Sequence, residues 1–97
     1  VKAEDVAYFE GEDRYVYLVK RDGSRFIVEY KLSDLDDLLD PALFFRLNRS
    51  FVAHFDAIDK ITVLSKSRVK VDLKPATSRE VIVSTENTRD FKAWLNQ

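Results

Sequence analysis

Apolar and polar residues alternate along much of the chain with the two-residue period of half-buried β-strands. Residues 5–10 and 14–20 are rich in aromatic and β-branched side chains, which suit a pleated surface. The dipeptide Asp22-Gly23 separates them from a third such stretch, residues 25–30, and supplies the positive φ angles of a tight hairpin. We therefore expect an antiparallel meander of three strands, which excludes a parallel Rossmann sheet for this half.

Helical spacing replaces this alternation after residue 30. Leu35, Leu38 and Leu39 recur at the i, i+3, i+4 positions of one apolar face, with Ser33 as the expected N-cap and Pro41 as the end. Three acidic side chains fall in the first turn, where the helix dipole favours negative charge: Asp34, Asp36 and Asp37. They lack the spacing and the glycine of a calcium loop, so the pattern favours a solvated helix end over a metal site.

The second half of the chain predicts further strands and a last helix. Residues 60–64 and 68–73 read as two strands, and the second alternates apolar with charged side chains. Residues 79–83 form a nearly continuous apolar run, which we expect at the centre of a sheet. Ser84 is the expected N-cap of a helix whose inward face carries Phe91, Trp94 and Leu95.

Composition agrees with one small globular domain. The chain has 97 residues, is 45% hydrophobic, and includes seven Phe, four Tyr and one Trp, which is enough for a single core. It has no cysteine, no apolar run long enough to span a bilayer and no signal-peptide pattern. The expected fold is mostly β, with antiparallel sheets of about six or more strands, one short helix and a C-terminal helix in a single domain, residues 1–97. Because the chain starts without methionine, we expect a piece of a longer protein.

The charge is unevenly distributed. A net charge of −1 is not the basic balance typical of nucleic-acid-binding proteins. Residues 1–40, however, carry eleven acids against six bases, whereas residues 41–97 carry six acids against ten bases. This reversal predicts a dipolar surface that is positive in the second half.

The chain offers little for catalysis. Its one histidine, His54, lies between Ala53 and Phe55, where a hydrogen-bonded structural histidine is the commoner outcome. No second His or Cys can complete a metal site with it, and neither glycine belongs to a phosphate-binding loop. We expect a binding protein, not an enzyme, with no cofactor and no metal.

Basic and amide side chains interrupt the most aromatic segment, residues 44–58. Read as a strand, this segment places Arg46, Asn48 and Ser50 on one face and Arg49 on the other, so neither face is purely apolar. Arginine and asparagine are the side chains that fork onto base edges and phosphates. The simpler alternative is that the arginines cover a sheet edge and pair with acids.

Two further segments could add polar groups to this one. They are the loop Glu12–Arg14 and the start of the last helix, Ser84–Arg89, whose backbone N–H groups suit a phosphate. Arg89 and Lys92 lie three residues apart on the exposed side of that helix. Loops of this kind would have to enter the grooves of a duplex one by one, and bending the duplex would let more than one of them reach.

The order Phe-Phe-Arg-x-x-Arg-Ser-Phe-Val over residues 44–52, followed by His54 and Ile58, resembles the signature segment of the LytTR DNA-binding family. The resemblance extends from Val6 to Leu95 and implies a mostly antiparallel β fold. It also implies binding of direct promoter repeats by loops in successive major grooves, with a minor-groove contact between them. Such domains are the output of bacterial two-component response regulators, so the resemblance further implies a cytoplasmic protein that binds double-stranded DNA as a homodimer through a receiver domain absent from this chain.

Carried over by position, the base-reading residues of the family fall near Asp13 or Arg14, and at Asn48 and Arg49. A third contact falls at the pair Thr85 and Glu86. The full set of candidate DNA-binding residues comprises Arg14, Arg46, Asn48, Arg49, Ser50, Asn87, Arg89 and Lys92.

Three positions depart from the family pattern. The family often has His at position 48, Asn at position 54 and Ser-Arg at positions 84 and 85. Thr85 cannot replace an arginine fork and Glu86 would repel a phosphate, so the third contact would pass to Asn87 or Arg89.

A non-enzymatic protein- or peptide-interaction or sensory β module is the alternative function. The salt dependence of binding distinguishes this function from DNA binding. Each neutralised phosphate makes log affinity fall by about 0.9 per log unit of salt, whereas binding in an apolar peptide groove would barely change. Position also separates them. DNA binding is favoured if Arg14, Arg49 and Arg89 or Lys92 share one face.

Overall fold

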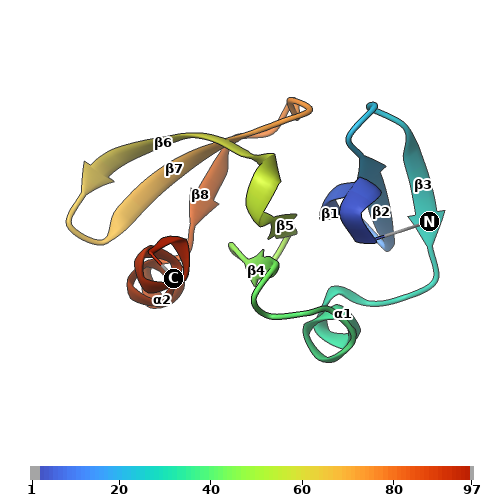
Figure 1. Cartoon of the computed structure of the whole chain (residues 1–97), viewed down its shortest axis with the longest axis horizontal. Helices are drawn as coiled ribbons and strands as arrows, with labels where there is room; N and C mark the ends of the chain where they lie inside the picture. The colour runs from blue at the N-terminus through green and yellow to red at the C-terminus, as the bar shows by residue number, and fades with distance from the viewer. Residues whose placement is uncertain (1–2, 97) are drawn as a thin grey trace.

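The computed structural model describes residues 3–96, which form two antiparallel sheets and two α-helices (Figure 1). The five-stranded sheet has the order β3-β2-β1-β5-β4, with β1 (Val6–Glu12), β2 (Tyr15–Lys20), β3 (Arg25–Val28), β4 (Phe44–Arg46) and β5 (Phe51–His54). The three-stranded sheet has the order β6-β7-β8, with β6 (Ile58–Ser65), β7 (Arg68–Leu73) and β8 (Val81–Val83). The helices are α1 (Leu32–Leu38) and α2 (Thr85–Leu95), and the 3-10 turns are Ala3–Asp5 and Phe55–Ala57. The expected fold class is confirmed, with eight strands among the described residues.

The expected meander forms the first three strands, which pair antiparallel in sequence. In the turn between β2 and β3 only Gly23 has positive φ, at 93°, while Asp22 accepts the N–H of Ser24 through its side chain at 2.9 Å. The turn between β1 and β2 is tighter than expected, because β1 continues to Glu12 and Asp13 takes the left-handed position with φ 57°.

Helix α1 begins earlier than expected. Its N-cap is Lys31 rather than Ser33, and Asp34 accepts the N–H of Lys31 at 3.2 Å from the third helical position. The expected inward face is also partly wrong. Leu32 and Leu35 are buried and Leu39 packs against the same cluster, whereas Leu38, the last residue of the helix, is exposed.

The middle of the five-stranded sheet is buried on both faces, whereas its edge strand β3 is largely exposed. One face packs against α1 through a cluster that includes Phe9, Phe44 and Val52. The other face packs against the three-stranded sheet and α2, and this larger cluster includes Tyr8, Phe51 and Phe91. Figure 1 shows the two helices apart from each other, with α2 beside β8. The sheet is therefore the central layer of the molecule.

Strand β8 lies at an edge of its sheet, not at the centre as its apolar run suggested, and β7 is the central strand. Val81 and Val83 are nevertheless buried, because α2 follows β8 directly and covers it. The expected alternation in β7 is confirmed, with Val69, Val71 and Leu73 buried. The apolar run thus reflects packing in the core between the two sheets and α2 rather than a central place in a sheet.

Helix α2 docks as expected. Phe91 and Trp94 are buried and Leu95 packs against the same core. The indole Nε1 of Trp94 donates to the carbonyl oxygen of Pro41 at 3.1 Å, which ties the end of α2 to the loop before β4. Among residues 3–96, no helix is long and apolar enough to cross a membrane.

Candidate nucleic-acid interface

Residues 47–50, which we call the tip loop, join β4 to β5 and are held by the side chain of Asn48. Its Oδ1 accepts the N–H of Ser50 at 2.7 Å and of Phe51 at 3.0 Å, and its Nδ2 donates to the carbonyl oxygen of Ile82 in β8 at 2.8 Å. Asn48 is a preferred residue for such a turn because its side chain can replace a missing backbone partner. The amide is therefore committed to the shape of the loop and to its attachment to the other sheet.

Arg46 supports the same loop from β4. Its Nε donates to the carbonyl oxygen of Asn48 at 2.9 Å and its Nη2 to that of Arg49 at 3.5 Å. Its Nη1 forms an ion pair with Asp36 of α1 at 2.9 Å. Asn87 of α2 in turn donates to the carbonyl oxygen of Arg46 at 3.3 Å. All three nitrogens of the Arg46 guanidinium thus have acceptors within the protein.

Arg49 differs from its neighbours in the tip loop. Its side chain is exposed and makes no hydrogen bond or ion pair to any residue in the part of the chain that the structure describes. Ser50 is half-buried, and its carbonyl oxygen accepts the N–H of Gly11 at 2.7 Å. The loop is thus rigid in its backbone but presents a free guanidinium.

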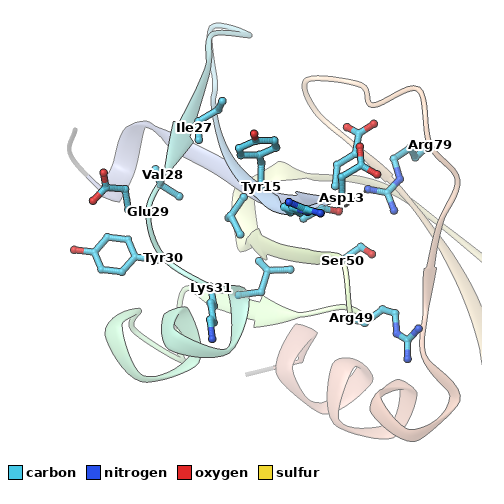
Figure 2. Close-up of a pocket in the computed structure, with 15 residues that line it drawn as sticks. Asp13, Tyr15, Ile27, Val28, Glu29, Tyr30, Lys31, Arg49, Ser50 and Arg79 are labelled. Carbon is cyan, nitrogen blue, oxygen red and sulfur yellow. Dashed lines mark hydrogen bonds between the residues drawn. The ribbon is translucent and has the colours of Figure 1, made fainter.

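The bond between Gly11 and Ser50 brings the turn between β1 and β2 beside the tip loop. Between them lies an open depression of about 890 Å³, which we call the first concavity. Arg14 lines it from the turn, and Arg49 and Ser50 line it from the tip loop. Figure 2 shows Ser50 between Arg49 and Arg79 along one side, with Glu29 and Tyr30 opposite.

A second concavity, of about 660 Å³, lies on the other side of the tip loop. Glu86 and Asn87 from the first turn of α2 line it together with the tip loop. Arg49, Ser50 and Arg79 line both concavities and form the ridge between them. The three polar segments singled out in the sequence therefore lie side by side, with the tip loop in the middle.

Two candidate residues lie outside both concavities. Lys92 donates to the carbonyl oxygen of Lys66 at 3.4 Å, in the turn between β6 and β7. Arg89 is exposed on the same helix and lines neither depression. The arrangement thus brings together Arg14, Arg49 and Asn87, but not the two cations farther along α2.

Sequence reasoning did not find Arg79. It precedes β8, and its Nη1 donates to Glu10 at 3.2 Å and to the carbonyl oxygen of Gly11 at 2.9 Å. Nothing in the local pattern marks it, because its partners lie 68 and 69 residues away in the chain. Only the packing of one sheet on the other brings the two segments together.

The linings of the two concavities are electrostatically balanced. They carry five cations, Arg14, Lys31, Arg46, Arg49 and Arg79, and five acids, Glu12, Asp13, Glu29, Glu80 and Glu86. Two of the cations are paired with acids of the protein: Arg46 pairs with Asp36, and Arg79 shares the carboxylate of Glu10 with Arg25. Any attraction for an anion must therefore come from the placement of individual arginines rather than from a strong positive field.

His54 is a buried structural residue, as expected. Its Nδ1 accepts the N–H of Asp56 at 3.0 Å, which caps the 3-10 turn, and its ring packs edge-on against Phe44. Burial lowers the pKa of His54, and the nearby Arg21 lowers that pKa further. Within residues 3–96, no group of three or more His, Cys, Asp or Glu side chains is arranged to hold a metal ion.

Comparison with known proteins gives consistent matches. A family model described as the LytTr DNA-binding domain matches residues 1–96. Two curated proteins of Paraburkholderia xenovorans (strain LB400) are similar, the heme-containing CO-sensing transcriptional regulators RcoM 1, 28% identical over 92 residues, and RcoM 2, 26% identical over 95 residues. The matches cover 95% and 98% of this chain but 34% and 35% of those proteins, so the chain spans about a third of their length.

A solved structure shares the fold. It is the LytTr DNA-binding domain of a putative methyl-accepting/DNA response regulator from Bacillus cereus, with a TM-score of 0.84 and 24% identity. The match covers 100% of this chain and 86% of that one.

Proposed function

Because the chain belongs to the LytTR family of DNA-binding domains, we propose that it reads promoter DNA through the ridge and the two concavities beside it. The family is a DNA-binding one rather than an enzymatic one, which is consistent with the expected absence of catalysis. The observation that carries the proposal is the side chain of Arg49, which stands without a protein partner on a loop whose backbone is fixed by Asn48 and Arg46. A rigid loop with one free guanidinium is suited to a bidentate contact with a guanine edge.

The candidate residues divide into two roles under this proposal. Arg14, Arg49 and Asn87 contact the duplex, assisted by the hydroxyl of Ser50. Arg46 and Asn48 act through the loop that they hold, because their polar groups are engaged with Asp36, Ile82 and the loop backbone. Arg89 and Lys92 serve as outer phosphate contacts for a duplex that extends along α2.

The dimensions of the molecule constrain how it meets DNA. Its longest extent is 35 Å, about one helical turn of B-DNA. The tip loop, the β1–β2 turn and the start of α2 occupy only part of that length, because hydrogen bonds tie them together. Contacts in two successive major grooves would therefore need a duplex bent toward the domain.

We extend the proposal to the whole protein. The domain is the output part of a bacterial cytoplasmic two-component regulator, and an upstream receiver brings two copies onto a direct repeat. The similar Bacillus cereus domain belongs to a putative methyl-accepting/DNA response regulator, which supports this. The two curated relatives are heme-containing CO-sensing transcriptional regulators instead.

The deciding experiment is selection of bound duplexes from a random-sequence library, followed by titration of the selected duplex at several salt concentrations. We expect enrichment of a spaced direct repeat and a fall in affinity with rising salt. Arg49→Ala should weaken specific binding by about 1 to 3 kcal/mol, as expected for an arginine on a base edge.

Arg68→Ala is the matched control. Arg68 is also exposed and makes no side-chain hydrogen bond within the described residues, but it starts β7, away from both concavities. A folded Arg49→Ala variant that loses less than about 0.5 kcal/mol of specific binding would contradict the role of Arg49. No enrichment and no retention at low salt would reject DNA binding and favour a protein-interaction module.

A further inference from the structure

Glu10 is buried although it is acidic. Its residue is 4% exposed, and in the sheet it lies opposite Tyr17 of β2 and Phe51 of β5. A buried carboxylate is unfavourable unless it is paired. Two guanidinium groups pair with it, Arg25 on Oε1 at 3.4 Å and Arg79 on Oε2 at 3.2 Å.

The guanidinium of Arg79 is held in one orientation. Besides Glu10, its Nη1 contacts the carbonyl oxygen of Gly11 at 2.9 Å, and the group lies over the ring of Phe51 at 5.1 Å from its centre. Its side chain is still 37% exposed. Among residues 3–96, its Nε and Nη2 donate to no protein acceptor.

The position of Arg79 suggests what those free N–H groups bind. Arg79 lines both concavities and forms part of the ridge with Arg49. Arg49 projects from the tip loop and can adapt to a base edge, whereas Arg79 is anchored to the sheet. A fixed, planar, partly exposed guanidinium with two free donors matches the oxygens of a phosphodiester.

We propose that Arg79 binds a phosphate of the DNA backbone at the ridge, and that Glu10 is the positioning residue that orients its guanidinium. This rests on the proposed function and deepens it, because it separates a positioning contact at Arg79 from a base-reading contact at Arg49. A phosphate contact carries no sequence information of its own, so its loss weakens specific and non-specific binding equally.

The test compares Glu10→Gln/Arg79→Gln with Glu10→Gln. Replacing Arg79 alone would leave the buried carboxylate with only Arg25 and endanger the fold, whereas the two amides of the double variant can pair with each other. The two proteins differ only at position 79. In Glu10→Gln, Arg79 keeps its hydrogen bond to the carbonyl oxygen of Gly11, so its guanidinium stays at the ridge. Each is titrated at several salt concentrations against the duplex selected from the library and a scrambled duplex of the same length.

We expect the double variant to bind both duplexes about tenfold more weakly than Glu10→Gln at low salt. Its slope of log affinity against log salt should be smaller by about 0.9. Glu10→Gln/Arg25→Gln is the matched control. It removes the other cation that pairs with Glu10, and Arg25 lines neither concavity. It should keep the slope of Glu10→Gln.

Equal slopes for the Arg79 pair would overturn this inference, even if the double variant were less stable. An equal loss of slope in the Arg25 control would overturn it too, because net charge alone would then explain the effect. Failure of the unsubstituted domain to bind any duplex would overturn the proposed function with it, so the two failures are distinguishable.

Discussion

Replacing Asn48 by alanine should destabilise the domain more than it affects any direct contact with DNA. The substitution removes three hydrogen bonds, from the N–H groups of Ser50 and Phe51 and to the carbonyl oxygen of Ile82. At about 0.5 to 1.5 kcal/mol of net stability each, the expected loss is about 3 kcal/mol. A domain of this size has about 5 to 15 kcal/mol in total, so the loss is a large fraction.

The assay is urea unfolding followed by the fluorescence of the single tryptophan, Trp94, which is buried in the core. A loss of about 3 kcal/mol lowers the midpoint by roughly 2 M urea. Asn48→Asp keeps the acceptor for the two N–H groups but replaces the bond to Ile82 by repulsion between two oxygens, so any stability that it loses relative to the wild type comes from the contact with Ile82. Arg49→Ala is the matched control, and its stability should change by no more than about 0.5 kcal/mol.

One combination of results would refute this reasoning. If Asn48→Ala lost less than about 1 kcal/mol of stability but more than about 1 kcal/mol of specific DNA binding, the amide would read a base and its three internal bonds would be expendable. Asn48→His provides a further comparison in the same assay.

Three further perturbations test other parts of the structure. Burial lowers the pKa of His54 in the folded protein, so the neutral ring contributes its full stability above the unfolded pKa of about 6.5, and this contribution is lost as the pH falls below that value. In urea unfolding, His54→Asn should therefore lose less stability than the wild type between pH 7.5 and about 5.5. Equal losses in the two proteins would contradict this prediction. Glu86→Gln should strengthen DNA binding about threefold at low salt and less at high salt, because Glu86 lines the second concavity and its charge repels a phosphate there. An unchanged affinity would mean that the duplex does not approach α2. Gly23→Ala should lower the free energy of unfolding by about 1 kcal/mol, because the φ of 93° strains any residue with a side chain. No atom lies within 4 Å of the added Cβ, so the loss would come from the backbone alone. An unchanged free energy of unfolding would show that the turn relaxes.

The sequence predicted the fold class because its strands and turns are locally encoded. Alternation in β7 and the position of Gly23 in its turn each depend on neighbouring residues, and the structure confirms both. The place of β8 could not be predicted in the same way. Val81 and Val83 are buried in the core shared by the other sheet and α2, and an apolar run looks the same whether neighbouring strands or packed layers cover it.

The sequence supplied candidate residues for the site but not the long-range contacts that hold them. The composition of the tip loop and its resemblance to a known family singled out residues 46–50, and the structure shows that Arg46 and Asn48 hold this segment through hydrogen bonds to its backbone. The roles of Asn48 and Arg79 could not be derived, because both depend on partners in the other sheet, Ile82 for the first and Glu10 for the second. Hydrogen bonds between residues this far apart in the chain produce no periodic pattern in the sequence.

The way the tip loop is anchored affects how its specificity could change. Asn48, Arg46 and the N–H of Gly11 hold the loop through backbone atoms of their partners, and the Arg49 side chain takes no part in that support. The residue at position 49 can therefore be exchanged while the loop stays where it is. A library randomised at positions 14 and 49 on an otherwise fixed domain would be a practical route to new DNA preferences.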